Sequence, residues 1–391
     1  MLKLNKLFIY EDQPEAFNLT IQPTEQQRLF LTGCKNAIRD HLRDGIRSAS
    51  KTVLGMDKVI EPRFRTQGSW SYRTCVQGAY QPPQQMDWDF GVYLPATTWE
   101  NHRPRVAAKV YFALVEQLLE SLCQRKGWQL LKGQACKDTC IRVQVAAWAH
   151  IDIPLYAAPE AKFLQILERA INMDAASTHD AVYLAESAVY GEPPDWSWVD
   201  LDEIVLATRS GEWKPSDPAA VSNWFNDRIA EHGEQLRRVW RYIKAWRDYV
   251  WPDGGGPSSV MLMIAVAQGF QPSPKRDDLA LEHVAAHLIT ALGLDIREVA
   301  IDDGSEDFNR LDARERRDAC MKAADLRNSI RDARTCTVNE KGQSIEGLRG
   351  QFGDRIPYRL DWLDIDGQAE IVRSTEATVV PLPRVTTTKA G

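Results

Sequence analysis

The sequence lacks the features that mark membrane proteins, secreted proteins and proteins stabilised by a structural zinc site. Its longest nearly continuous apolar run, residues 260–267 of 391, is far shorter than the roughly 20 residues that a helix needs to span a bilayer. The first residues contain neither a long apolar core nor a small-residue cleavage site, so no signal peptide is expected. The 7 cysteines are scattered, and the close pair Cys136 and Cys140 has no second pair to complete a zinc site. We therefore expect a cytoplasmic protein with free thiols and no membrane partner.

The chain also has no excess of positive charge. It holds 48 basic and 54 acidic residues, a net charge of −6, so its overall field does not attract nucleic acid. No His/Cys spacing indicates a zinc-finger insertion, and DNA is not an expected partner. With 44% apolar and 26% charged residues, disorder, collagen and coiled coil are excluded. The composition favours a globular protein, expected to be a monomer, that acts on small molecules.

The first half of the chain is expected to mix helices and strands. Apolar residues recur at helical spacing in two segments, whereas period-two alternation indicates strands elsewhere. Glycines and prolines break up the stretch before the first strand. The expected elements are a helix over 24–50, a strand over 88–94, a helix over 106–123, and a hairpin of 141–145 and 150–156.

The second half is expected to be almost entirely helical. Asp217 is a candidate N-cap followed by Pro218, and one helix is predicted from there to Tyr249. The stretch 195–217 is rich in Trp, Pro and Gly and suits a crossover between the halves. Further helices are predicted over 258–269, 277–292, 306–334 and 342–352, and an extended tail from 372 onward.

Three carboxylates carry the chemical interpretation. Asp87 and Asp89 stand two apart, so on a strand both side chains leave the same face. Asp152 lies on a later strand, and its apolar neighbours Ile151 and Ile153 are expected to face the core while it faces the other way. Three converging carboxylates can hold two Mg²⁺ ions, which stabilise the attacking and leaving oxygens of a phosphoryl transfer. The pattern Asp-x-Asp also occurs by chance, so its context decides.

The context is a glycine-serine pair upstream of the acids. Gly68 lets the backbone approach a phosphate closely, and Ser69 offers an amide and a hydroxyl donor. Alone, such a pair indicates only a turn. The order Gly-Ser, Asp-x-Asp and then a strand Asp is far more specific, and it indicates nucleotidyl transfer.

These motifs resemble those of a known family. The stretches PRFRTQGSWSYRT and QPPQQMDWDFGVYLP resemble the polymerase-β-like nucleotidyltransferases, and within them the bacterial cGAS/DncV-like enzymes. The likeness continues through HIDIPLYAAP, WKPSDPAAVSNWFND, KAWRDYVW and GGPSS. It implies an α+β fold, with a mixed-sheet core and backing helix over 1–215, an oligoadenylate-synthase-like helical domain over 216–371 that closes the nucleotide cleft, and a flexible tail over 372–391.

The resemblance also assigns roles to the motif residues. Asp87, Asp89 and Asp152 would bind the two metal ions, with Mn²⁺ as an alternative to Mg²⁺, and Asp152 would help to deprotonate the attacking hydroxyl. His150 would be a structural residue and not a ligand. The nucleotide contacts implied by the resemblance are Gln67, Gly68, Ser69, Tyr72 as a base-stacking aromatic, Lys244, Ser258 and, on a loose local match, Asp307 as a reader of guanine.

Simpler roles compete at three of these positions. Ser258 could be only an N-cap, Lys244 a solvated charge, and Tyr72 a core residue. Near the N-terminus, an arginine-rich face around Arg39, Arg43 and Arg47 could bind a folate-like regulator known in the family, although a solvated charged face is the simpler interpretation.

The implied activity is synthesis of cyclic GMP-AMP from ATP and GTP by two successive Mg²⁺-dependent nucleotidyl transfers, within antiphage (CBASS) signalling. Its product would activate a downstream effector. One alternative is an oligoadenylate-type or cyclic trinucleotide synthase of the same fold, and another is a non-catalytic nucleotide-binding module. In some relatives a terminal glycine is conjugated by a ubiquitin-like transferase, and Gly391 could be such a site, although glycine is common enough to stand there by chance.

Overall fold

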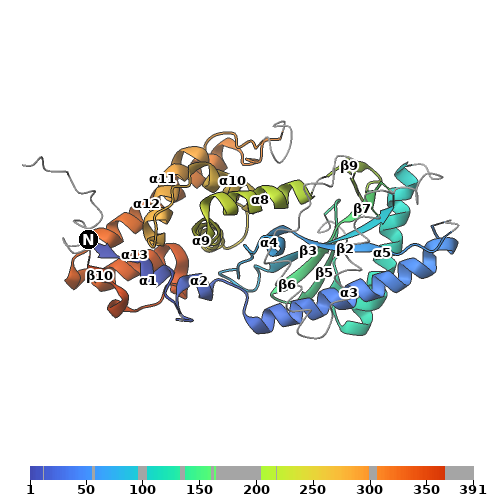
Figure 1. The fold of residues 1–391 in the computed structure, drawn as a ribbon, viewed down its shortest axis with the longest axis horizontal. Coiled ribbons are helices and arrows are strands. Elements are labelled where there is room, and N and C mark those ends of the chain that lie inside the picture. Colours follow the sequence, from blue (N-terminus) through green and yellow to red (C-terminus); the bar gives the residue numbers. More distant parts are fainter. Residues whose placement is uncertain are drawn as a thin grey trace, which may run out of the picture.

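The structure, a computed structural model, describes residues 1–11, 13–54, 58–95, 104–132, 137–159, 163, 204–216, 218–298 and 306–365. A mixed sheet with two long helices forms one part, and a bundle of helices forms the other (Figure 1). This is the expected α+β architecture. Asp217, the tail over 372–391 and residues 195–203 of the predicted crossover lie outside the described residues.

Strand β3 (Met86–Pro95) organises the sheet. It pairs antiparallel with β2 (Arg63–Gln67) and parallel with β6 (Ala149–Ile153) and β7 (Leu155–Ala158). The strand order is β4-β5-β6-β3-β7-β8-β9, with β2 on β3. The other strands are β4 (Gln129–Leu130), β5 (Ile141–Ala146), β8 (Val205–Ala207) and β9 (Trp213–Pro215).

Two long helices, α3 (Glu25–Thr52) and α5 (Pro104–Lys126), cover one face of this sheet (Figure 1). Thr24 starts α3 with a capping box. The apolar side chains of both helices pack with Met86, Trp88 and Phe90 of β3 in one core. Because side chains alternate along a strand, the residues between these three project from the opposite face. The predicted helices over 24–50 and 106–123 are confirmed.

The predicted hairpin is confirmed, with one difference. Strands β5 and β6 pair antiparallel, and Arg142 lies opposite Asp152. The stretch 150–156 is not one strand, because it passes from β6 to β7 at Pro154, which has no backbone N–H for the ladder. The carbonyl oxygen of Pro154 still accepts a hydrogen bond from the Val92 N–H, which keeps both strands beside β3.

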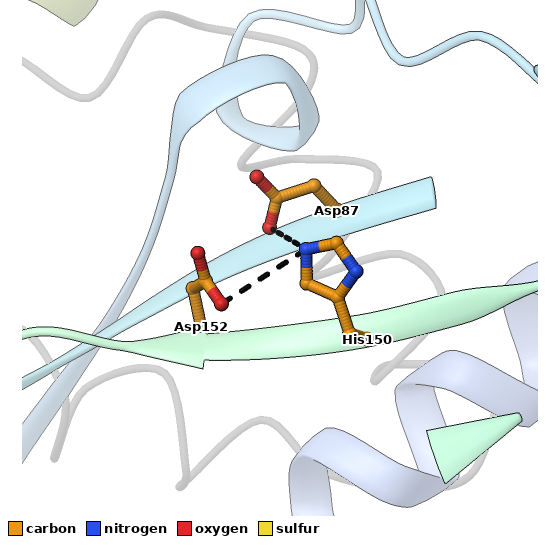
Figure 2. Close-up of side chains that lie close together, drawn as sticks. All are labelled: Asp87, His150 and Asp152. Atoms are coloured by element: carbon orange, nitrogen blue, oxygen red, sulfur yellow. Dashed lines mark ion pairs between the residues drawn. The ribbon is translucent and has the colours of Figure 1, made fainter. Parts of the chain in front are cut away.

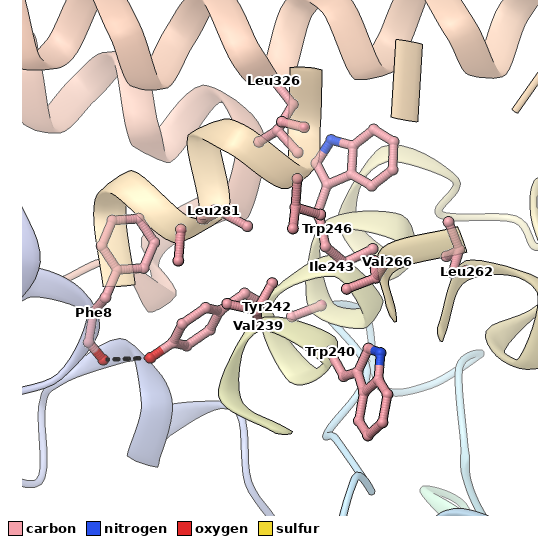
Figure 3. Packing of buried hydrophobic residues seen from close by; sticks show 14 of the residues in the cluster. Phe8, Val239, Trp240, Tyr242, Ile243, Trp246, Leu262, Val266, Leu281 and Leu326 are labelled. Atoms are coloured by element: carbon pink, nitrogen blue, oxygen red, sulfur yellow. Dashed lines mark hydrogen bonds between the residues drawn. The ribbon is translucent and has the colours of Figure 1, made fainter. Parts of the chain in front are cut away.

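The helical part is built around α9 (Glu234–Val250) (Figure 3). Trp240, Tyr242 and Trp246 of this helix are fully buried and belong to the core. No helix in the described part of the chain combines the length and hydropathy needed to traverse a bilayer. The other long helices are α8 (Pro218–His232), α10 (Ser259–Gly269), α11 (Asp277–Ala291), α12 (Ala313–Thr335) and α13 (Lys341–Phe352), and 3₁₀ turns cover 338–340, 353–355 and 360–362.

Two predicted helices in this half were wrong in extent. The single helix from Pro218 to Tyr249 is two helices, because Gly233 separates α8 from α9 with a φ of +78°. The helix predicted over 306–334 begins only at Ala313, after the N-cap Asp312. The Asp312 side chain accepts from two backbone amides of the first turn, which fixes the start of the helix there.

The N-terminal segment packs with the helical part, although the sequence division placed it in the core over 1–215. Strand β1 (Leu2–Lys3) pairs with β10 (Asp364–Ile365), and α1 (Asn5–Phe8) and α2 (Phe17–Thr20) bury their apolar side chains in the helical core (Figures 1 and 3). The Leu4 amide donates to the buried Asp278. That division is therefore corrected for residues 2–21, while the boundary near 215 stays a prediction.

Candidate active site

A cavity of about 580 Å³ lies between the second face of the sheet and the helices α8, α9 and α10. This volume is in the range of small-molecule sites. Both parts of the chain contribute to its walls. The sheet side supplies Gln67, Gly68, Ser69, Tyr72, Asp87 and Asp89, and the helical side supplies Ser222, Lys244, Arg247, Gly254, Gly255 and Ser259.

Gly68 lies where β2 turns into the short helix α4 (Gly68–Ser71). Its φ of +61° is in the left-handed region, which favours glycine. A Cβ atom at this position would lie 2.0 Å from Oδ2 of Asp89. The backbone of the predicted Gly-Ser turn therefore touches a carboxylate directly, which only glycine permits.

The three predicted acids converge. Asp87 and Asp89 project from the second face of β3, and the parallel register places Asp89 opposite Asp152 and Asp87 opposite His150. Ile151 and Ile153 lie in the core, as expected. Asp152 itself is only 1% exposed and does not line the cavity. Asp87 and Asp89 are thus the acids that face a ligand, with Asp152 behind them.

Two cations neutralise Asp152. The Arg142 guanidinium donates from Nε at 2.6 Å and from Nη2 at 2.7 Å, and Lys137 Nζ donates at 2.9 Å. Burial works to raise the pKa of Asp152, but the hydrogen bonds and charges of Arg142 and Lys137 outweigh it and lower that pKa to about 2. Asp152 is therefore ionised throughout the physiological range.

Asp89 is in the opposite situation. Burial, followed by repulsion from Asp87 and Asp152, raises the pKa of Asp89 to about 7. Two buried atoms nearby, Oδ1 of Asp87 and Nε2 of His150, have no hydrogen-bond partner among the described residues. Unbalanced negative charge and unpaired donor atoms fit a divalent cation, since carboxylate oxygens are the ligands that such ions prefer. Asp87, His150 and Asp152 form a candidate metal-binding group (Figure 2).

The helical wall carries positive charge. Lys244 is buried and donates from Nζ to the Thr74 carbonyl oxygen at 2.6 Å, and burial lowers its pKa to about 8. Lys244 is therefore not a solvated surface charge. Arg247, which the sequence analysis missed, lies on the same helix and donates to the Pro257 carbonyl oxygen and to Ser259 Oγ. It thereby holds the glycine-rich segment before α10 in place.

Ser258 caps α10, because its side chain accepts from the Met261 amide. Its neighbour Ser259, and not Ser258 itself, lines the cavity. The capping role that the sequence analysis weighed is therefore present, and the role in phosphate binding stays a prediction.

Three other residues predicted to contact nucleotide, Tyr72, Gln67 and Asp307, form ring contacts, hydrogen bonds or ion pairs with other residues of the protein. Tyr72 lines the cavity but is 5% exposed, and its ring centroid lies 4.6 Å from that of Phe225. The Gln67 amide donates to the Tyr93 hydroxyl and accepts from that of Tyr156.

Asp307 accepts from two backbone amides and pairs with Arg316, and it is not among the residues that line the cavity. The nucleotide contacts of Gln67, Tyr72 and Asp307 all stay predictions.

The three arginines of α3 that could bind a folate-like regulator are also paired. Arg39 contacts Asp40, and Arg43 and Arg47 both contact Glu61. This arrangement agrees with a solvated charged face.

Two family matches cover both parts of the chain. Residues 62–156 match the family described as cyclic GMP-AMP synthase DncV-like, nucleotidyltransferase domain. Residues 233–362 match the family described as cyclic GMP-AMP synthase, C-terminal domain. The chain belongs to the DncV-like nucleotidyltransferases.

Relatives of this DncV-like nucleotidyltransferase are named cyclic GMP-AMP synthase. One from Vibrio cholerae is 36% identical over 240 residues, which are 58% of this chain and 53% of the relative. One from Escherichia coli is 38% identical over 212 residues, 53% of this chain and 47% of the relative. The chain thus spans about half the length of the curated relatives it matches.

Solved structures show the same fold. The Vibrio cholerae DncV cyclic AMP-GMP synthase in complex with a linear intermediate matches with a TM-score of 0.74 and 23% identity, covering 94% of this chain and 99% of that one. The apo form of DncV matches with a TM-score of 0.71 and 21% identity, covering 93% of this chain and 98% of that one.

Proposed function

We propose that this chain makes cyclic GMP-AMP from ATP and GTP in two successive nucleotidyl transfers at one site. The observation that carries the proposal is the convergence of Asp87 and Asp89 with the Gly68-Ser69 turn on the wall of the cavity. The relatives named cyclic GMP-AMP synthase support the choice of product.

The sheet wall supplies the metal-binding part of the mechanism. Asp87 and Asp89 would hold two Mg²⁺ ions, which supply positive charge to the attacking and leaving oxygens of the transfer. Ser69 lines the same cavity as these carboxylates, and its amide and hydroxyl would bind the donor triphosphate. Gly68 keeps the backbone close enough for both tasks, since it has no side chain between the turn and Asp89.

For Asp152 we propose an electrostatic role, whereas the resemblance implied a metal ligand that also helps to deprotonate the attacking hydroxyl. The lowered pKa of Asp152 makes it a poor acceptor for a proton, so in this proposal it contributes negative charge to the site. Arg142 holds both oxygens of Asp152 and fixes its orientation. The side chain of Lys137 is 53% exposed, so Lys137 is the partner of Asp152 that can move away when metal ions and nucleotide bind.

The helical wall binds the phosphates of the substrates. Lys244, Gly255 and Ser259 line the cavity, and the N-terminus of α10 favours an anion there, as helix N-termini do. Arg247 holds the glycine-rich segment before α10 in place by donating a hydrogen bond to the Pro257 carbonyl oxygen. In the second transfer the linear intermediate would turn over between the same two walls. Its free hydroxyl would then form a bond to the α-phosphorus of its own triphosphate, which closes the ring and releases pyrophosphate.

Product identification tests the proposal. The purified chain with ATP, GTP and MgCl₂ should release pyrophosphate and form a phosphatase-resistant product with the mass of cyclic GMP-AMP, whose linkage is read with linkage-specific nucleases. If the product is a linear oligoadenylate or a cyclic trinucleotide, the assignment of cyclic GMP-AMP is wrong, but the chain is still a nucleotidyltransferase. Nucleotide binding without pyrophosphate release under any mixture of nucleotides would leave only a binding module.

The cellular role in antiphage signalling is part of the same proposal. Cells that express the chain should resist phage infection only when the carboxylates of the site are intact and a cyclic-nucleotide-activated effector is present. Conjugation at Gly391, which lies outside the described residues, is tested separately by deleting that residue and probing for a covalent adduct.

A further inference from the structure

His150 is oriented by a chain of hydrogen bonds that leads away from the cavity. Gln85 Nε2 donates to the Ala147 carbonyl oxygen at 3.1 Å, so the Gln85 carbonyl Oε1 is turned toward the imidazole. His150 Nδ1 lies 2.9 Å from this Oε1 and must donate to it. In the neutral ring the remaining nitrogen, Nε2, therefore carries a lone pair.

This lone pair points at carboxylates. Nε2 lies 3.1 Å from Oδ1 of Asp87 and 3.9 Å from Oδ1 of Asp152 (Figure 2). Oδ1 of Asp87 and Nε2 of His150 are both buried, and neither has a hydrogen-bond partner among the described residues. A lone pair that faces two anions is unfavourable unless positive charge lies among them.

A neutral histidine held only for structure does not explain this arrangement, because positive charge is needed between Nε2 and the carboxylates, either as a proton on Nε2 or as a metal ion. The hydrogen bond through Nδ1 would be enough to hold the ring, yet it aims the second nitrogen at the acidic cluster and not at a backbone carbonyl. Orientation of a ring by a hydrogen bond to its distal nitrogen is the usual arrangement around metal-ligating histidines. The separation of 3.1 Å between Nε2 and Asp87 Oδ1 also agrees with the roughly 3.0 Å between neighbouring ligands of an octahedral ion with bonds of about 2.1 Å.

Asp152 is less available to such an ion than Asp87. Both of its oxygens accept from Arg142, and Oδ2 also accepts from Lys137. Asp87, by contrast, has a side chain that is 40% exposed toward the cavity. The donor atoms that await a cation are therefore one carboxylate oxygen and one imidazole nitrogen.

We propose that His150 is an inner ligand of the ion held by Asp87, and that this mixed nitrogen and oxygen site prefers Mn²⁺ over Mg²⁺. Imidazole suits transition metals, whereas Mg²⁺ takes oxygen ligands almost exclusively. The inference deepens the proposed function, because it assigns the chemistry of one of the two ions. It also revises the structural role that the sequence analysis gave to His150.

Metal binding tests this directly. The full-length chain, stripped with EDTA and then given a non-hydrolysable ATP analogue, is titrated with Mn²⁺ and followed by electron paramagnetic resonance, with Mg²⁺ as competitor. The bound Mn²⁺ should show coupling to a ¹⁴N nucleus in pulsed spectra. His150→Gln should abolish this coupling and weaken Mn²⁺ binding by about 10-fold or more, while Mg²⁺ binding changes less than about 2-fold.

Two further variants serve as controls. One removes a histidine outside the site, and the other removes the hydrogen-bond acceptor that orients His150. His283→Gln removes an exposed histidine of α11 and should keep both the ¹⁴N coupling and the Mn²⁺ affinity. Gln85→Leu leaves His150 in place but removes the acceptor that orients it, and should weaken Mn²⁺ binding by roughly 10-fold. Because it does not alter the ligand itself, it keeps the test decisive if His150→Gln fails to fold.

The outcomes separate this inference from the function on which it rests. Mn²⁺ and Mg²⁺ binding of equal strength, without ¹⁴N coupling and unchanged by His150→Gln, would overturn the nitrogen ligand and leave the nucleotidyl transfer intact. Failure to bind either ion in the presence of nucleotide would overturn the proposed function itself. Loss of the ¹⁴N signal in His150→Gln alone, with a fall in the ratio of Mn²⁺-supported to Mg²⁺-supported turnover, supports the inference.

Discussion

The two walls of the cavity are built from opposite charges and opposite kinds of secondary structure. The sheet wall presents Asp87 and Asp89 from one strand, whereas the helical wall presents Lys244, Arg247 and a helix N-terminus. Alternation along a strand places two acids on one face at a fixed spacing, and a helix N-terminus presents unpaired amides. Each type of element thus supplies the charge that its geometry presents best.

Removing the acids should produce the largest effect, because the acid that lines the helical wall, Asp248, is already paired with Arg247. Asp87→Asn with Asp89→Asn should lower product formation by at least about 10³-fold, since the charge that offsets the triphosphate is lost. Pyrophosphate release measures this. Asp253→Asn removes an exposed acid of the helical part and should keep near-normal turnover; equal activity in all three proteins would end the metal-based mechanism.

The contact between Gly68 and Asp89 should be the next most sensitive feature. Gly68→Ala introduces a Cβ 2.0 Å from the Asp89 carboxylate and should cost roughly 10²-fold in kcat, as displacements of about 1 Å do. Gly127→Ala is the matched control, because Gly127 has a φ of +69° but nothing within 4 Å of its would-be Cβ. If both variants lose the same activity, backbone strain and not the contact explains the loss.

On the helical wall, Lys244→Met should act mainly on substrate binding. Loss of a charge-assisted phosphate contact of about 1.5–3 kcal/mol should raise the KM for nucleotide by at least about 10-fold, with a smaller change in kcat. Because the pKa of Lys244 is lowered to about 8, the wild-type protein should lose nucleotide affinity between pH 7 and pH 9. The variant should lack this part of the pH dependence, as calorimetry at several pH values can check.

The smallest effect concerns the stability of the metal-free protein. The pKa of Asp89 is about 7 in the folded state against a usual value of 3.8, so the folded state binds a proton that the unfolded state releases. Stability from this group is full below pH 4 and is lost as the pH rises through 7. In EDTA the wild-type protein should melt at a lower temperature at pH 8 than at pH 5.

Asp89→Asn isolates this contribution. The variant should lack the part of the pH dependence between pH 4 and pH 7 that comes from Asp89, and a divalent ion should restore the melting temperature of the wild-type protein at pH 8. An identical pH dependence of melting in both proteins would show that Asp89 is not the group that titrates.

The sheet wall could be predicted from sequence more completely than the helical wall. The spacing of Asp87 and Asp89 and the strand around Asp152 were enough to bring the acids together, because strand periodicity is local. The partner of Asp152 could not be predicted in the same way. The predicted hairpin pairs position 143 with Asp152, and a register shift between Gln144 and Ala146 is what brings Arg142 opposite Asp152. Lys137 gave no signal either, because its contact depends on the path of a loop.

The helical part depends on contacts that no local pattern reveals. A positive φ at Gly233 divides one apparent helix in two, and Asp312 delays the start of another. The helical period continues across both breaks, so periodicity alone extends each helix too far. Arg247 is a single charge on a helix rich in arginine, and its bonds to Pro257 and Ser259 appear only in three dimensions.

The packing of the N-terminal segment limits how the chain can be divided. Leu4, Leu7, Phe8 and Phe17 are fully buried in the helical core, so a truncated fragment that starts at residue 216 would expose the apolar surface that they cover. Conversely, a fragment that ends there would carry these side chains without their partners. Dissection into separately expressed halves therefore has to keep the first 21 residues with the C-terminal half.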